Sequence, residues 1–145
     1  MREPLVMPDS RTLLVSVKPA YAELILAGIK TVELRRVRPH VEVGADVLLY
    51  ASSPAMAMVG TARVASVDVR DINAIWASYG PSTGIDRETY DEYYVGNEHA
   101  VAIALTDVRR LRRRVPLAEL RQRIIGFNPP QSFRYLGATE ASAAV

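Results

Sequence analysis

The segment from Lys18 to Arg38 (KPAYAELILAGIKTVELRRVR) combines a helix signal, a stop signal and a strand signal in one short stretch. Pro19 suits the first turn of a helix, where its missing N–H is not needed. Apolar residues then recur at helical spacing until Gly28, and glycine is favoured just after the last turn of a helix. Residues 30–37 follow as a β-branched, apolar strand. We therefore expect a short helix that reverses direction at Gly28 and packs on a sheet.

The remaining sequence predicts mainly strands within one domain. Apolar or alternating runs predict strands at residues 11–17, 46–52, 57–70 and 99–111, and short helices are expected near 72–76, 86–94 and 116–123. Residues 1–10 lack periodicity and are expected to form a flexible arm, and residues 137–145 a flexible tail. A chain of 145 residues fits a single α+β domain over 11–136 with five or six strands.

Composition excludes several kinds of protein. The chain has no cysteine, which rules out disulfides, a thiol nucleophile and cysteine-based zinc sites. Its two histidines, His40 and His99, stand in no spaced cluster with carboxylates, so we expect no metal and no cofactor. The apolar runs are shorter than the roughly 18 residues of a membrane helix, and the N-terminus mixes charges with prolines. A cytoplasmic protein without a membrane partner is expected.

Charge is segregated along the chain although the net charge is only +2. Residues 109–123 hold seven arginines against Glu119, and residues 30–38 hold four cations against Glu33. By contrast, residues 68–98 carry seven acids against two arginines. A basic side of this kind indicates a polyanionic partner. Two solvated faces without a partner would give the same pattern.

Three further segments complete a family resemblance. Gly28, Lys30, Glu33 and Arg35 match the spacing of the ASCH (activating signal cointegrator homology) motif, and GADVLLYASS (44–53) and PPQSFR (129–134) agree with the strand and the ending of that domain. The chain resembles the ASCH family, of the PUA-like superfamily, from about Thr12 to Leu136. The resemblance implies a small PUA-like β-barrel with flanking short helices, and a cleft beside the motif that faces RNA or a nucleotide-sized ligand.

The resemblance leaves the activity open. Family members are described as predicted RNA-binding proteins, as amidohydrolases of acetylated cytidine nucleosides, or as ribonucleases, and a fold does not determine which applies. The amidohydrolases carry threonine where this chain has Glu33. They also use a downstream glutamate, for which the candidates in this chain are Glu88, Glu92 and Glu98.

Strand alternation predicts which motif side chains share a face of the strand. If Val32 and Leu34 face the core, Glu33 and Arg35 face a cleft or solvent. Lys30 shares the parity of the core-facing pair, so it reaches the cleft only from the start of the strand or from a bulge. A carboxylate within about 4–6 Å favours the ammonium form of a lysine, which argues against Lys30 as a general base. With Lys30 and Glu33 as catalytic residues, Glu33 would be the base and Lys30 would stabilise an oxyanion. Without catalysis, Lys30 would be a surface lysine or a phosphate contact, and Glu33 would form an ion pair with Arg35 or orient it.

Candidate ligand contacts are the cationic, hydroxyl-bearing, amide and aromatic side chains beside these segments: Lys18, Lys30, Arg35, Arg36, Arg38, Tyr50, Ser52, Ser53, Gln131, Ser132 and Arg134. Tyr50 could stack a base, although tyrosines in such strands more often belong to the core. If the last strand continues through Arg109–Arg114, then Arg110, Arg112 and Arg114 share one face. That face could follow a phosphate backbone or could be a solvated edge that blocks sheet addition.

We therefore expect an RNA- or nucleotide-binding ASCH protein. The alternative is a metal-independent hydrolase that acts on a modified nucleoside such as acetylcytidine, or a ribonuclease that acts on single-stranded RNA. A third interpretation is a regulatory protein whose basic face meets another protein. The sequence does not indicate an oligomeric state.

Overall fold

The computed structural model describes residues 11–145, so the arm expected at residues 1–10 lies outside the described residues. Six strands form one sheet in the order β2-β5-β4-β3-β1-β6. The strands are β1 (Thr12–Val17), β2 (Val32–Arg35), β3 (Asp46–Ala51), β4 (Ala57–Asp71), β5 (His99–Pro116) and β6 (Phe133–Leu136). The α+β class and the number of strands are confirmed.

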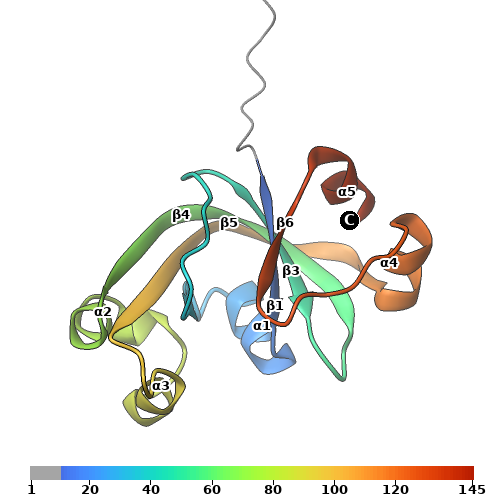
Figure 1. Cartoon of the computed structure of the whole chain (residues 1–145). Coiled ribbons are helices and arrows are strands. Elements are labelled where there is room, and N and C mark those ends of the chain that lie inside the picture. Colours follow the sequence, from blue (N-terminus) through green and yellow to red (C-terminus); the bar gives the residue numbers. More distant parts are fainter. Residues whose placement is uncertain (1–10) are drawn as a thin grey trace, which may run out of the picture.

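The sheet is strongly curled, as the long arcs of β4 and β5 show in Figure 1. It is a half-barrel, because no ladder within residues 11–145 joins the edge strands β2 and β6. β1 and β3 run parallel, and all other neighbours are antiparallel. The chain passes from β1 through α1 and β2 before it returns to β3. Strand β2, which carries the motif, lies at the edge of the sheet beside β5.

Short helices cover the sheet: α1 (Pro19–Leu26), α2 (Ile72–Tyr79), the 3-10 turn η1 (Gly80–Ser82), α3 (Arg87–Tyr93), α4 (Leu117–Arg123) and α5 (Ala138–Ala143). Helix α1 ends as predicted, with Gly28 at φ 79° in the left-handed region. The segment after Leu136 differs from the expected frayed tail. It forms α5, and Ala144 is fully buried, because its small residues pack against Leu136 and α4.

The core consists of three clusters, one on the concave face of the sheet and two on the other face. The concave face carries the central cluster, to which α1 contributes Ala22 and Ile25. On the convex face, α2 and α3 cover β2 and β5, and we call this group the α2–α3 layer. At the other end of the sheet, α4 and α5 cover β1, β3 and β4 and form the α4–α5 layer. Figure 1 shows these two layers at opposite ends of the molecule.

The arginine run interrupts the ladder between β4 and β5. Gly60 pairs with Arg110 and Met58 pairs with Val115, so the four residues 111–114 lie opposite Val59 alone. This bulge interrupts the regular alternation on which a common face for Arg110, Arg112 and Arg114 was predicted, and all three residues are exposed. Repulsion between adjacent guanidinium groups disfavours a regular ladder at this point.

In the part of the chain that the structure describes, no helix is long and apolar enough to cross a membrane. The cytoplasmic location expected above stays a prediction.

Candidate functional site

The motif strand β2 directs two charged side chains toward the concave side of the sheet. Glu33 and Arg35 pair with Ile103 and Val101, whose side chains belong to the central cluster. The prediction that Glu33 and Arg35 share the face opposite Val32 is therefore confirmed. Only 7% of Glu33 and 8% of Arg35 is exposed, so both charged groups are held inside the half-barrel.

Arg35 connects the two edges of the sheet. Its Nη2 donates to the carbonyl oxygen of Ser16 in β1 at 2.9 Å. Its Nη1 donates to the hydroxyl and the carbonyl oxygen of Ser132, just before β6, at 3.1 and 3.3 Å. Because β2 lacks a ladder to that edge, this guanidinium replaces the missing backbone contacts. We call the region where the two edges meet the seam.

Lys30 enters the seam from the start of β2. Its Nζ donates to the carbonyl oxygens of Val32 at 3.0 Å and Thr83 at 2.6 Å, and it lies 3.8 Å from Glu33 Oε1. The side chain is 2% exposed. Lys30 precedes the first residue of β2, and this position lets it escape the parity that would have turned it away from Glu33. The motif lysine and glutamate therefore converge.

The loop between η1 and α3 closes over Lys30 because of Gly84. This glycine has φ 74°, and a Cβ atom placed on it would lie 3.2 Å from Lys30 Cβ. Thr83 beside it is fully buried and caps the turn through its hydroxyl, which donates to the carbonyl oxygen of Gly80 at 2.7 Å.

Burial lowers the pKa of Lys30, and the Glu33 carboxylate opposes that shift. Arg35 adds a smaller contribution that also lowers this pKa. Glu33 therefore favours the ammonium form of Lys30, as expected, but the loss of hydration on burial outweighs this single carboxylate.

Two atoms of the seam are left without a partner. Glu33 Oε1 accepts from the backbone N–H of Leu34 at 3.1 Å, whereas Oε2 lies 3.5 Å from Arg35 Nη2 without a hydrogen bond. Glu33 Oε2 and Arg35 Nε are buried and have no hydrogen-bond partner within residues 11–145. Buried polar atoms are nearly always paired, so this pair marks a place where a polar ligand could complete the network.

A pocket of about 670 Å³ opens over the seam. Its lining comes from β1, α1, β2, the loop after β3, α3 and the segment before β6: Ser16, Val17, Lys18, Tyr21, Lys30, Glu33, Leu34, Arg35, Arg36, Ser52, Ile85, Thr89, Glu92, Tyr93, Pro130, Gln131 and Ser132. This volume lies within the range of about 300–1,000 Å³ that is usual for small-ligand sites. The pocket has the size of one nucleotide unit.

Two tyrosines from different helices line this pocket. Tyr21 on α1 has Lys18 Nζ at 6.0 Å and Lys30 Nζ at 5.5 Å from its ring centroid. Tyr93 on α3 carries the Arg36 guanidinium 4.0 Å from its ring centroid, and Arg36 Nε donates to the carbonyl oxygen of Tyr93 at 2.9 Å. Neither tyrosine was predicted as a site residue from the sequence. The only signal was their position, at the first turn of one helix and the last turn of another.

The structure places most of the predicted contacts in this pocket: Lys18, Lys30, Glu33, Arg35, Arg36, Ser52, Gln131 and Ser132. Among the downstream glutamates, Glu92 lines the pocket, whereas Glu88 and Glu98 do not. Arg38, Ser53 and Arg134 also lie outside the lining, and Arg134 instead pairs with Glu140 at 3.2 Å.

Tyr50 has no exposed ring for a base to stack on, so the stacking role predicted for it is wrong. Its side chain belongs to the cluster under α4 and α5 and is 2% exposed. The parity of β3 turns it to the convex face of the sheet. Its hydroxyl is buried without a hydrogen-bond partner in the described chain, and burial raises the pKa of the phenol.

Among residues 11–145, no group of three or more His, Asp or Glu side chains is arranged to hold a metal ion. The chemistry available in the pocket is that of two carboxylates, Glu33 and Glu92, with several cations, hydroxyl groups and aromatic rings.

The curled six-stranded sheet and the buried motif in its seam define an ASCH-type domain. The model of the ASCH domain family matches residues 15–109, which is more than half of the chain. The chain therefore belongs to the ASCH domain family.

Similar proteins support this assignment. The chain is 32% identical over 139 residues to an ASCH domain-containing ribonuclease of Zymomonas mobilis subsp. mobilis, covering 96% of this chain and 93% of that protein. A crystal structure of ASCH from Zymomonas mobilis superposes with a TM-score of 0.88 at 31% identity, over 93% of this chain and 94% of that one.

A more distant likeness concerns the fold alone. Human THYN1, solved in complex with DNA containing 5-methylcytosine, superposes with a TM-score of 0.56 at 15% identity, over 91% of this chain and 94% of that chain.

Proposed function

We propose that this protein binds single-stranded RNA and holds one nucleotide unit in the seam pocket. The observation that carries the proposal is a nucleotide-sized pocket in which Lys30, Glu33 and Arg35 converge and whose lining includes two tyrosines. Aromatic faces stack bases, and cations contact phosphates. The full-length likeness to a protein named as a ribonuclease supports RNA as the ligand.

The cations of the pocket divide into two groups. Lys30 and Arg35 are buried and donate to backbone oxygens, so they mainly hold Glu33 and the seam in place. Lys18 and Arg36 are exposed at the pocket, and these two would contact the phosphates. Tyr21 and Tyr93 would stack the base, in place of Tyr50.

A second candidate function, RNA cleavage, is favoured by the unpartnered Glu33 Oε2. As general base, this carboxylate would take the proton of a ribose 2′-hydroxyl. The 2′-oxygen would bond to phosphorus, the bond from phosphorus to the 5′-oxygen would break, and the leaving oxygen would take a proton from water. Arg35 and Lys30 would stabilise the extra negative charge on the phosphate in the transition state.

Binding is tested by fluorescence anisotropy with a labelled single-stranded RNA at several salt concentrations. We expect affinity to fall as salt rises, and Arg36→Ala to weaken binding and to reduce the salt slope by about 0.7. The matched control is Arg38→Ala, because Arg38 is also exposed and lies two residues away, but outside the pocket. Absence of binding at low salt, or equal losses in the two variants, would contradict the proposal.

Cleavage is tested by incubating end-labelled RNA with the protein, with and without a chelator. Glu33→Gln keeps the shape of the side chain and removes its basicity, so we expect product to disappear while RNA binding remains. Glu88→Gln is the control, because Glu88 is an exposed glutamate of α3 outside the pocket. Undiminished cleavage by Glu33→Gln would exclude Glu33 as the base. Acetylcytidine serves as a second substrate, and its hydrolysis in place of RNA would favour the amidohydrolase alternative.

A further inference from the structure

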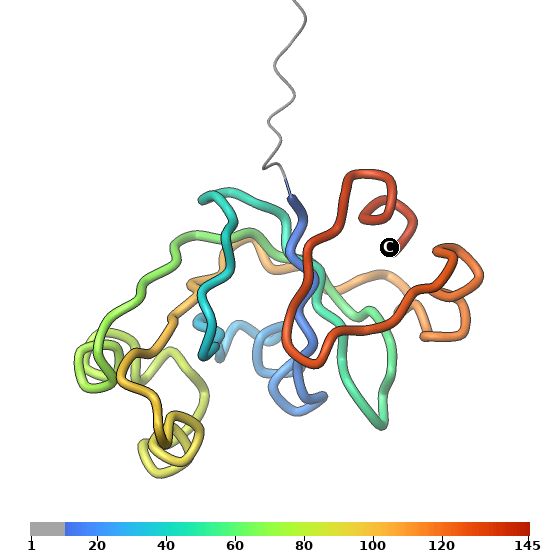
Figure 2. The backbone as a smooth tube through the Cα atoms, in the orientation of Figure 1, coloured from blue at the N-terminus to red at the C-terminus, as the bar shows by residue number. Residues whose placement is uncertain are grey.

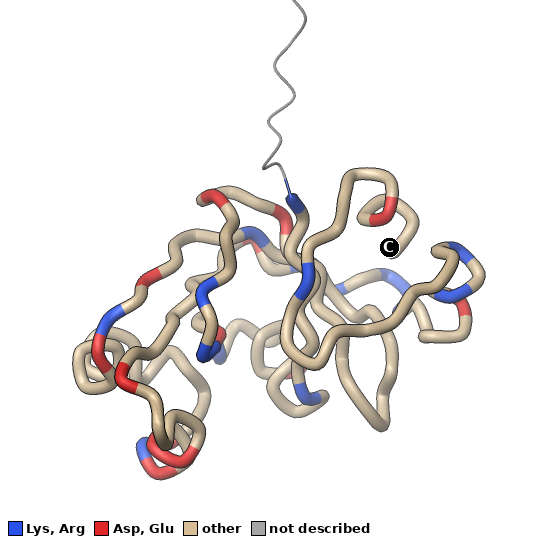
Figure 3. The backbone as a smooth tube through the Cα atoms, in the orientation of Figure 1, with Lys and Arg blue, Asp and Glu red and all other residues tan. Residues whose placement is uncertain are grey.

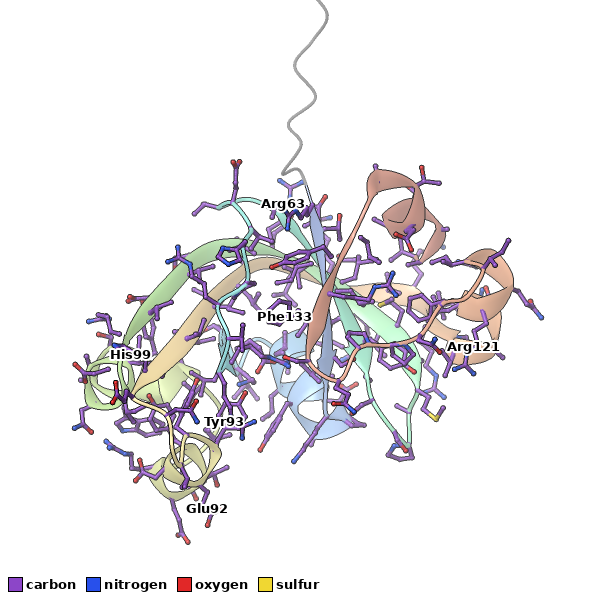
Figure 4. The ribbon with its side chains drawn as sticks, viewed as in Figure 1. Arg63, Glu92, Tyr93, His99, Arg121 and Phe133 are labelled. Carbon is purple, nitrogen blue, oxygen red and sulfur yellow. The ribbon has the colours of Figure 1, made fainter. Side chains whose placement is uncertain are left out.

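A group of arginines lies at the other end of the molecule from α3. We call it the arginine ridge, and it consists of Arg112, Arg113 and Arg114 in the β5 bulge and Arg121 and Arg123 on α4. All five are exposed. Figure 3 shows the cations of β5 and α4 gathered at this end, and Figure 4 labels Arg121 there, opposite Glu92 and Tyr93 on α3.

The ridge has more positive charge than its own contacts neutralise. Glu119 accepts from both Arg113, at 2.8 Å, and Arg123, and it is the one acid in residues 109–123. The guanidinium groups of Arg112 and Arg114 form no hydrogen bond or ion pair with any residue from 11 to 145. By comparison, Arg110 of the same strand is neutralised by Glu23, with Nη2 and Oε2 3.0 Å apart.

The bulge explains why these charges are free. Since residues 111–114 lie opposite Val59 alone, their backbone leaves the β4 ladder and their side chains gain no cross-strand acidic partner. Elsewhere in β5, Arg109 pairs with Asp107 within the same strand, with Nε and Oδ1 3.1 Å apart. Clustered cations repel one another, and a polyanion relieves that repulsion.

One segment connects the ridge to the pocket. Arg121 donates to the carbonyl oxygen of Phe127 and to Asn128 Oδ1, both at 3.3 Å, and Arg134 donates to the carbonyl oxygen of Asn128 at 3.3 Å. Four residues further along the chain from Asn128, Ser132 lies in the pocket lining. Figure 2 shows this segment running from α4 toward β6 without a detour.

We propose that the arginine ridge is a second contact region for the phosphate backbone of the strand whose nucleotide occupies the seam pocket. This inference rests on the proposed function and narrows it, because it makes the ligand a polymer of several nucleotides. A free nucleoside or mononucleotide could fill the pocket but has no further phosphates to place on the ridge.

The test compares a dinucleotide with a ten-nucleotide single-stranded RNA, bound by the wild-type chain and by Arg112→Ser/Arg114→Ser. We expect the wild type to bind the longer RNA at least tenfold more tightly. The double variant should lose most of that gain while its dinucleotide affinity is unchanged. Two lost phosphate contacts should lower the salt slope for the longer RNA by about 1.4.

The control is Arg63→Ser/Arg87→Ser, which removes the same charge from exposed positions outside the ridge and the pocket. Thermal unfolding of each variant verifies that it is folded. If the two double variants lose equal affinity for the ten-nucleotide RNA, only net charge matters, and the proposed role of the ridge is wrong. Equal wild-type affinity for both RNA lengths also overturns it and leaves the pocket intact. No binding of either RNA by the wild type overturns the proposed function itself.

Discussion

The α2–α3 layer and the α4–α5 layer cover opposite ends of one sheet by different means. The α2–α3 layer is aromatic. The ring of Tyr90 packs against Trp76 and Tyr94, and Tyr94 also packs against Tyr93, with ring centroids 4.7 to 4.9 Å apart. Both of its α-helices begin with a side-chain cap, since Asp71 accepts from the N–H of Ala74 and Asp86 from that of Thr89.

The α4–α5 layer is mostly aliphatic and is less firmly capped. Leu117, Leu120 and Ile124 pack α4 on the sheet, and α5 adds only small residues. In the described chain, neither helix has a side-chain hydrogen bond at its N-cap, where Pro116 and Gly137 stand. Helix α4 of this layer carries Arg121 and Arg123 of the arginine ridge, and β5 carries the other three arginines.

The contrast indicates a division of roles. Rings that pack edge to face fix one another's orientation, so the α2–α3 layer is suited to hold Tyr93 as a fixed wall of the pocket. Cations that contact a flexible phosphate backbone need no such precision. The five predictions below test this contrast, beginning with the largest expected effects.

Truncating one buried residue in each layer should show whether the layers are independent. Ile75 of α2 and Leu120 of α4 are both fully buried. We expect Ile75→Ala and Leu120→Ala each to lower the free energy of unfolding by about 4 kcal/mol, as measured by urea denaturation. Amide hydrogen exchange should then rise mainly in the layer that carries the substitution. An equal rise in both layers would show that they open as one unit.

Arg35 joins the sheet edge under the α2–α3 layer to the edge under the α4–α5 layer. Arg35→Ala removes one of the two cations beside the buried Glu33 and also the hydrogen bonds to Ser16 and Ser132, so we expect a loss of about 3 kcal/mol in the free energy of unfolding. Arg36→Ala is the matched control. Arg36 is next to Arg35 but is exposed, so its removal should change the free energy of unfolding by less than about 0.5 kcal/mol. Similar values for the two variants would show that the seam does not hold the edges together.

Two buried tyrosines should respond differently to loss of their hydroxyl groups. The Tyr90 hydroxyl donates to the carbonyl oxygen of Ile72 at 2.8 Å, whereas the Tyr50 hydroxyl has no partner in the described chain. At pH 8 we therefore expect Tyr90→Phe to lower the free energy of unfolding by about 1 kcal/mol, and Tyr50→Phe to leave it nearly unchanged. Urea denaturation measures both, and a clear loss for Tyr50→Phe would point to an unseen partner.

The same variants define a dependence on alkaline pH. Burial raises the pKa of Tyr90 to about 12, whereas an unfolded tyrosine ionises near pH 10. Because the unfolded chain loses the proton first, the contribution of this phenol is complete below about pH 10 and is lost as pH rises toward 12. Between pH 8 and pH 11, wild type should lose about 1.4 kcal/mol more than Tyr90→Phe. A constant difference between the two proteins would contradict the shift.

Helix capping should give the smallest effects. Asp71→Ala removes the cap of α2 and should cost about 1 kcal/mol. Gly137→Asp should add a cap to α5 and stabilise it by a few tenths of a kcal/mol, since Gly137 has an extended backbone with φ −74° and ψ 170°. Thermal unfolding measures both changes. If Gly137→Asp destabilises the protein, the missing cap does not limit the stability of α5.

The helices and strands could be predicted closely because their signals are local. Apolar alternation, Pro19, Gly28 and the β-branched runs act within a few residues, and the structure places strands and helices at those positions. Helix α5 was missed because its small residues carry no strong apolar pattern. It is helical because Ala144 finds a buried position beside α4.

The candidate site was predicted in part. Glu33 and Arg35 followed from strand parity, which is a property of the backbone. Tyr21 and Tyr93 could not be found, because nothing local shows that two helices so far apart in sequence line one pocket. Tyr50 was assigned to the wrong place, since the apolar run of β3 is buried on both faces and parity alone does not say which face is which.

The sequence by itself determined the family, the order of the helices and strands from β1 to α4, and the shared face of Glu33 and Arg35, all through short-range geometry. Only the tertiary structure decided that Lys30 reaches Glu33, that Arg35 bridges two sheet edges, and that the arginine run bulges out of its ladder. These outcomes depend on how far the sheet curls and on which distant segments then meet. That balance is set by the packing of the whole core.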